Sequence, residues 1–138
     1  MELTNVLPPQ DNEFAALKAG LTKYNESHIG SVLREKVSSF IKDKSGNIVG
    51  GVLGEIHWDW MHIQGLWVDE SIRKRGWGAK LLAHIEAYAL SQDITNIRLE
   101  TTTFQALGFY IEAGYDIFGQ LDDMPKNHTS YFLKKKLV

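Results

Sequence analysis

The sequence contains no cysteine and only three prolines. Without cysteine the chain has no disulfide, no thiolate metal ligand and no thiol nucleophile, and it is compatible with a reducing compartment. Neither sign of charge dominates, because 15 basic and 17 acidic residues leave a formal net charge of -2. A general attraction to nucleic acid or to an anionic membrane is therefore not expected, and any anion site has to be built locally.

Long hydrophobic runs are missing as well. No apolar run approaches the ~20 residues that span a bilayer, and Met1–Pro9 lacks the basic and apolar regions of a signal peptide. The histidines stand at positions 28, 57, 62, 84 and 128 without a short ligand cluster, which argues against a metal site. No G-x-S-x-G motif of a serine hydrolase is present. The sequence thus indicates a cytoplasmic protein with no metal, no membrane and no nucleic-acid partner.

The order of apolar patterns predicts one mixed α/β domain over residues 1–138. A short opening strand is expected first, then a helix capped by Asp11 or Asn12, and then a second short helix near Ile29–Arg34. Further strands are predicted at Val37–Ile41, Ile48–Trp58, Met61–Val68, Asn96–Glu100, Tyr115–Leu121 and Ser130–Leu137, with helices at Gly76–Ser91 and Gln105–Ala113.

A basic loop lies between an apolar strand and an amphipathic helix. The segment Arg73–Lys80 holds four cations in eight residues. At a helix start the backbone N–H groups lack partners and the dipole is positive, while Gly76 and Gly78 allow close approach of an anion. The loop either binds a phosphate or pyrophosphate, or is a solvated basic turn. Its spacing matches neither a Walker loop nor the G-x-G-x-x-G dinucleotide motif.

Two segments carry a family resemblance. In Leu66–Leu82 a strand leads into R-x-x-G-x-G at Arg73–Gly78 and a helix, and Ala106–Tyr115 reads A-x-x-x-Y-x-x-x-G-Y. In this order they resemble the GNAT superfamily of acyl-CoA-dependent N-acetyltransferases, and the resemblance extends over essentially the whole chain. It implies an α/β (α+β) fold with a central mixed, mostly antiparallel sheet of about six to seven strands. Helices flank this sheet, which is splayed between its fourth and fifth strands.

The resemblance implies acetyl-CoA as co-substrate. Backbone amides of the loop would bind its pyrophosphate, and the strand end Leu66–Val68 would pair with its pantetheine arm. The implied coenzyme contacts are Leu66, Trp67, Val68, Arg73, Lys74, Arg75, Gly76, Trp77, Gly78, Ala79, Lys80 and Thr103. Thr103 stands where the family often has asparagine, and its hydroxyl is alternatively a helix cap. Tyr110 matches the tyrosine that protonates the departing thiolate; without the resemblance it is a packing residue.

The acceptor side offers carboxylates and aromatic residues. An amine with a pKa near ~10.4 must lose a proton before it attacks a thioester. Glu100 and Glu55 are the leading candidates for this base, against the alternative that each is a surface carboxylate, and His62 is a weaker candidate. The four tryptophans at 58, 60, 67 and 77 either belong to the core or line a pocket suited to an organic cation.

The sequence therefore predicts an N-acetyltransferase that moves acetyl from acetyl-CoA to a primary amine of a small molecule by direct attack. One alternative is the same chemistry on a protein N-terminus or lysine. Another, from a different class, is a non-catalytic acyl-CoA-binding sensor. Family members are often dimers, so a homodimer is compatible with the resemblance. The sequence does not identify the amine.

Overall fold

The computed structural model describes all residues from Met1 to Val138 and divides into two compact units, Met1–Val32 and Leu33–Val138. The first unit contains one helix, α1 (Asp11–Ile29), whose start is fixed by a hydrogen bond of 2.8 Å from Gln10 N to Glu13 Oε1. The apolar residues that predicted this helix are exposed, and α1 has no buried residue. The predicted helix is confirmed, but its N-cap is Gln10 and not Asp11 or Asn12, because Glu13 binds the backbone N of Gln10.

Two predicted elements near the N-terminus are wrong. The short opening strand is absent, since the sheet contains no residue before Glu35 and a strand exists only where its backbone pairs. The second helix near Ile29–Arg34 is absent as well. Gly30 ends α1 with φ 72° and ψ -170°, a conformation outside the helical region that glycine adopts readily. The residues from Gly30 to Arg34 therefore belong to neither a helix nor a strand.

The second unit contains a six-stranded sheet in the order β1-β2-β3-β4-β6-β5. All neighbouring strands are antiparallel except β3 and β4, which are parallel. The strands are β1 (Glu35–Lys42), β2 (Ile48–His57), β3 (Trp60–Val68), β4 (Asn96–Thr102), β5 (Asp116–Asp122) and β6 (Thr129–Lys136), and the helices are η1 (Glu70–Ile72), α2 (Trp77–Ser91) and α3 (Leu107–Glu112). The predicted fold class is confirmed, and the number of strands is six.

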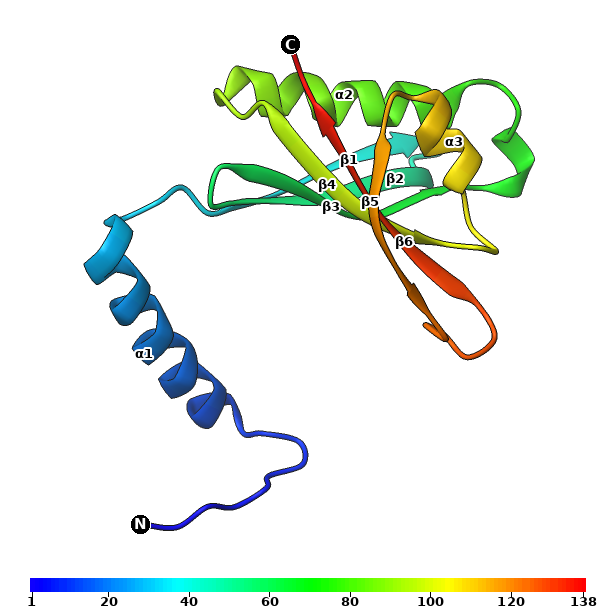
Figure 1. The fold of residues 1–138 in the computed structure, drawn as a ribbon. Coiled ribbons are helices and arrows are strands. Elements are labelled where there is room, and N and C mark those ends of the chain that lie inside the picture. The colour runs from blue at the N-terminus through cyan, green and yellow to red at the C-terminus, as the bar shows by residue number, and fades with distance from the viewer. The chain divides into compact units, whose positions relative to one another are not determined.

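Helix α2 covers one face of the sheet (Figure 1). Its residues Leu81, Leu82, Ile85 and Ala89 are buried, as their helical spacing predicted. The approach to β2 is close at Gly54, where an added Cβ would lie 2.8 Å from both Ile85 Cδ1 and Met61 Sδ. Because side chains alternate along a strand, the neighbours Glu55 and His57 point to the opposite face, here called the open face. None of the helices combines the length and apolar character needed to cross a bilayer.

The parallel pair β3 and β4 separates partway along its length. Pairing runs from Trp60 and Asn96 to Ile63 and Leu99, while the rest of β3 as far as Val68 pairs only with β2. The register shifts at this point, because Leu53 and Gly54 pair with Gly65 and Ile63 and leave Gln64 as an extra residue on β3. Such a bulge bends the strand that carries it. The edge of β3 that faces β4 is therefore open beyond Ile63. This is the predicted splay, and it lies between the third and fourth observed strands because the opening strand is absent.

Candidate functional site

A cavity of about 870 Å³, here called the loop cavity, lies at the open end of β3. The end of β3, the basic loop and the starts of α2 and α3 surround it. Its lining consists of Leu66, Trp67, Val68, Ile72, Arg73, Lys74, Gly76, Trp77, Gly78, Ala79, Phe104, Gln105, Ala106, Phe109, Glu112 and Ala113. The structure thus brings together nine of the twelve predicted coenzyme contacts, leaving out Arg75, Lys80 and Thr103.

The basic loop is held in shape by its own side chains. Arg73 Nε donates to the carbonyl of Val68 at 2.9 Å, which ties the loop to the end of β3. Lys74 and Gly76 have φ values of 63° and 80°, in the left-handed region that favours glycine. Lys80 places its ammonium 4.5 Å from the centre of the Trp77 ring rather than in the cavity. Of the four loop cations, only Arg73 and Lys74 line the loop cavity.

Helix α2 begins at this cavity without a side-chain cap. Gly76 is the residue that precedes the helix, and its carbonyl accepts the first helical hydrogen bond, from Lys80 N at 3.1 Å. The N–H groups of the first turn therefore have no intrahelical acceptor and no side-chain partner. Gly78 lies in this turn, and a Cβ there would meet the Phe109 ring of α3 at 3.4 Å. The arrangement offers backbone donors and a positive helix end to an anion.

Tyr110 lies on α3, directly after the cavity residue Phe109. Its side chain is buried, and its ring packs at 5.1 Å from the Phe109 ring and at 5.8 Å from the Tyr115 ring, centre to centre. Burial raises the pKa of its hydroxyl, which is therefore protonated at neutral pH. Tyr110 Oη has no hydrogen-bond partner in the protein. Among fully buried side-chain N and O atoms, only Thr102 Oγ1 lacks a partner. Tyr110 Oη is therefore not fully enclosed.

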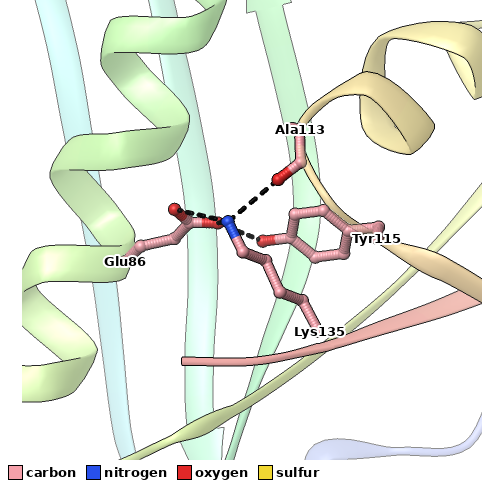
Figure 2. A network of polar contacts seen from close by, with 4 residues as sticks. All are labelled: Glu86, Ala113, Tyr115 and Lys135. Carbon is pink, nitrogen blue, oxygen red and sulfur yellow. Dashed lines mark hydrogen bonds and ion pairs between the residues drawn. The ribbon is translucent and has the colours of Figure 1, made fainter. Parts of the chain in front are cut away.

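A polar network anchors the segment that follows Tyr110 (Figure 2). Lys135 Nζ, on β6, donates to Glu86 Oε2 of α2 at 3.1 Å and to the carbonyl of Ala113 at 2.9 Å. Tyr115 Oη donates to the same Glu86 oxygen at 2.8 Å, and burial together with this contact raises the pKa of Tyr115. One ammonium group thus links α2, β6 and the end of α3, which carries Tyr110.

Thr103 lies apart from the loop cavity. Its Oγ1 is 2.9 Å from His128 Nδ1, and its backbone N donates to the carbonyl of Thr129 at 3.1 Å. Thr103 does not cap α3, which begins after Ala106 without a side-chain cap. The hydroxyl of Thr101 instead accepts from Ala106 N at 3.3 Å. These contacts hold the turn between β4 and α3. Thr103 thus binds the β5–β6 loop and does not line the loop cavity.

A second cavity, of about 620 Å³, lies on the open face and is here called the sheet cavity. It is lined by Arg34, Glu55, His57, Trp58, Trp60, His62, Gln64, Arg98, Phe118 and Lys134. Trp58 and Trp60 belong to it, while Trp67 and Trp77 line the loop cavity, so all four tryptophans line cavities. The two cavities follow one another along β3, because Gln64 lines one and Leu66 the other.

The two candidate base carboxylates have different partners. Glu55 Oε1 accepts from Arg34 Nε at 2.8 Å. Burial acts to raise the pKa of Glu55, but the hydrogen bond and the charge of Arg34 outweigh it and hold the pKa below its usual value. Glu100 is half-exposed and places Oε1 3.1 Å from His62 Nε2 and 3.5 Å from Arg98 Nη1. Glu100 follows Leu99, the last residue of β4 that pairs with β3.

Several cavity residues escaped the sequence analysis. Arg34, Arg98, Phe118 and Lys134 line the sheet cavity, and Phe104 and Phe109 line the loop cavity. Arg98 stands two residues before Glu100 on the same strand, so alternation places both side chains on one face. This spacing could have identified Arg98 from the sequence. The others come from separate strands and loops that only strand pairing brings together. No group of three or more His, Asp or Glu side chains is placed to hold a metal ion.

Comparison with known proteins agrees with the two motifs. The family model described as the acetyltransferase (GNAT) family matches residues 7–115. Over 104 residues the chain is 36% identical to a blasticidin-S acetyltransferase of Streptomyces morookaense, covering 75% of this chain and 76% of that protein.

Solved structures share the fold. The crystal structure of an acetyltransferase from Bacillus cereus ATCC 14579 is 35% identical and has a TM-score of 0.88, over 99% of this chain and 98% of that one. An aminoglycoside 6'-N-acetyltransferase complexed with coenzyme A is 18% identical and has a TM-score of 0.68, over 75% of this chain and 74% of that chain. At this lower identity the likeness concerns the fold alone.

Proposed function

Because the chain belongs to the GNAT family of acetyltransferases, we propose that it transfers acetyl from acetyl-CoA to a primary amine of a small molecule. The observation that carries this proposal is the open edge of β3 beyond Ile63, with the loop cavity and the sheet cavity following one another along that strand. A donor held in one cavity would thus present its reactive end to an acceptor held in the other.

The residues of the loop cavity fit acetyl-CoA, which supplies an acetyl group activated as a thioester. The free N–H groups of the first turn of α2 would bind the pyrophosphate, helped by Lys74. The unpaired edge at Leu66–Val68 would hydrogen-bond the amides of the pantetheine arm in the manner of an added strand. The aminoglycoside 6'-N-acetyltransferase that shares this fold was solved with coenzyme A bound.

Two groups would move protons. Tyr110 would protonate the departing thiolate, because its hydroxyl is protonated at neutral pH and makes no hydrogen bond within the protein. Glu100, with His62 at 3.1 Å, would take the proton of the attacking amine. Glu55 remains the second candidate base. Its carboxylate is bound by Arg34 and has a lowered pKa, which weakens it as a proton acceptor.

A small-molecule acceptor is favoured by the relatives. A blasticidin-S acetyltransferase is 36% identical to this chain over 104 residues. The sheet cavity, with indoles at Trp58 and Trp60, has the dimensions of a small-ligand site. Acetylation of a protein N-terminus or lysine is the second candidate, and a non-catalytic sensor the third. Three further predictions remain: a homodimer, a single domain over residues 1–138 and a cytoplasmic location. Light scattering would determine the oligomeric state.

Release of free coenzyme A tests the proposed function. We expect the purified protein to liberate thiol from acetyl-CoA when a small primary amine is supplied, at a rate that depends on the amine concentration. A panel of small amines and of peptides with free lysine or N-terminal amines separates the first two candidates. If acetyl-CoA binds tightly but no acceptor causes thiol release, the catalytic candidates are excluded and the non-catalytic sensor remains. If acetyl-CoA does not bind, the coenzyme site itself is wrong.

Replacement of Gly78 by aspartate tests the loop cavity. The new side chain would start 3.4 Å from the Phe109 ring and bring a negative charge to the donors of α2. We expect the affinity for acetyl-CoA, measured by calorimetry, to fall by roughly tenfold or more. Ala83→Asp is the matched control, since Ala83 is an exposed residue of α2 outside the cavity. Equal affinities of both variants and the unmodified protein would show that the loop was misassigned.

A further inference from the structure

One row of charged residues crosses the open face of the sheet. Strand pairing places these residues next to one another from β1 to β5, and the row consists of Lys36, Glu55, His62, Arg98, Lys134 and Asp116. Four of them, from Glu55 to Lys134 in this order, line the sheet cavity. The row therefore determines the electrostatic character of the proposed acceptor site.

Two cations are direct neighbours in this row. Arg98 on β4 and Lys134 on β6 are cross-strand partners, and like charges in this position destabilise a sheet. Lys134 takes part in none of the ion pairs of the chain, so no carboxylate lies within 4.0 Å of its ammonium group, and the ring of Phe118 is 5.8 Å away. Arg98 has Glu100 within 3.5 Å, so Lys134 is the member of this pair that lacks an ion-pair partner. A local cost of this kind is typical of functional sites.

The positive charges around the sheet cavity exceed the negative ones. Its lining includes three cations and the carboxylate of Glu55, which is paired with Arg34. Glu100, outside the lining, is paired with Arg98, so Lys134 is the lining cation without an ion-pair partner. Burial and the charges of Arg34 and Arg98 lower the pKa of His57, against the opposing effect of Glu55. An ammonium ion beside Lys134 would be repelled, so the aromatic lining alone does not make this part of the cavity a site for organic cations.

Resting on the proposed acetyl transfer, we propose that the amine acceptor also carries a carboxylate, which Arg98 and Lys134 bind. The guanidinium of Arg98 presents paired N–H donors that match the two oxygens of a carboxylate, and Lys134 adds a second charge. The bound anion neutralises the repulsion between the two cations. Arg98 and Lys134 are thus the residues that select the acceptor.

The proposed base lies beside this anion site. Glu100 Oε1 is 3.1 Å from His62 Nε2 and 3.5 Å from Arg98 Nη1. An acceptor that directs its amine to Glu100 would therefore bring its carboxylate to the neighbouring cations of the same face.

A matched pair of acceptors tests this inference. 6-Aminohexanoate and hexylamine carry the same amine on a six-carbon chain, with and without the carboxylate. We expect kcat/KM for 6-aminohexanoate to exceed that for hexylamine by about tenfold or more, because charge-assisted hydrogen bonds are strong. Equal values for the matched pair would overturn the inference while the proposed function stands.

Three variants test whether Lys134 causes the preference for an acceptor with a carboxylate. In Lys134→Met the ratio of the two kcat/KM values should fall toward one, and in Lys134→Arg, which keeps the charge, it should stay near that of the unmodified protein. Lys136→Met is the control, since Lys136 is exposed on the same strand but outside the cavity. An unchanged ratio in Lys134→Met would contradict the role of Lys134.

Binding without turnover separates this inference from the proposed function. Trp58 and Trp60 line the sheet cavity, so their fluorescence should change when hexanoate binds, and less when hexylammonium is added. The response to hexanoate should be lost in Lys134→Met. If hexanoate binds in this way but no amine releases thiol, the proposed function fails and the anion site stands. If hexanoate gives no response at any concentration that leaves the protein folded, the anion site is wrong.

Discussion

Replacing Tyr110 by phenylalanine is expected to lower kcat by about 10²–10⁴-fold, the range that general acid catalysis contributes. The substitution removes one oxygen atom. Because Tyr110 Oη has no hydrogen-bond partner in the protein, its loss leaves no other group unsatisfied. The aromatic contacts of the ring with Phe109 and Tyr115 remain. The fold and the KM for acetyl-CoA should therefore change little.

Steady-state kinetics of thiol release measure this effect. Tyr115→Phe is the matched control, because it removes the same atom five residues further along, where the hydroxyl donates to Glu86 instead. We expect this control to cost stability but to keep kcat within a few-fold. A kcat of Tyr110→Phe close to that of the unmodified protein would remove Tyr110 as the acid, and a raised KM with unchanged kcat would make it a coenzyme contact only.

Replacing Lys135 by methionine is expected to reduce the free energy of unfolding by about 2 kcal/mol, less than the loss of about 3–5 kcal/mol for a fully buried ion pair, because this pair is only partly buried. The side chains of Lys135 and Glu86 are only 25% and 15% exposed. Methionine retains most of the apolar chain of lysine but leaves the Glu86 carboxylate without its counter-charge. It also leaves the carbonyl of Ala113 without its donor (Figure 2).

Urea denaturation followed by circular dichroism gives the unfolding free energies. In a double-mutant cycle, Glu86→Gln combined with Lys135→Met should recover part of the loss, because no uncompensated charge then remains. Lys136→Met, at an exposed neighbouring position, should change stability by less than about 0.5 kcal/mol. If Lys135→Met behaves like this control, the network contributes nothing measurable, and α3 is held by apolar packing alone.

Strong local patterns predicted most of the elements. The helical spacing of Leu81, Leu82, Ile85 and Ala89 identified the buried face of α2, and the apolar runs identified the strands of the sheet. The two failures concern residues whose local pattern was weak. The N-terminal residues before Asp11 resemble a strand in composition but do not pair in the sheet, and Gly30 ends α1 where another short helix was expected.

The loop cavity was predictable because its parts are adjacent in sequence. An unsatisfied helix start and the glycines that permit close approach lie within Arg73–Lys80, and one strand precedes them. What the sequence did not reveal is how the loop cations are used. Arg73 binds the Val68 carbonyl and Lys80 lies over Trp77, since side-chain positions depend on neighbours that only the folded loop supplies.

The sequence by itself determined the family and the parts of the loop cavity, because the loop and the Tyr110 segment are continuous stretches whose geometry is local. Tertiary structure decided the sheet cavity. The row from Glu55 through His62 and Arg98 to Lys134 combines four strands, and its members become neighbours only through strand order and register. A shift of one residue in the register of any strand would turn its side chain to the other face. No local sequence pattern therefore predicts that these residues lie side by side.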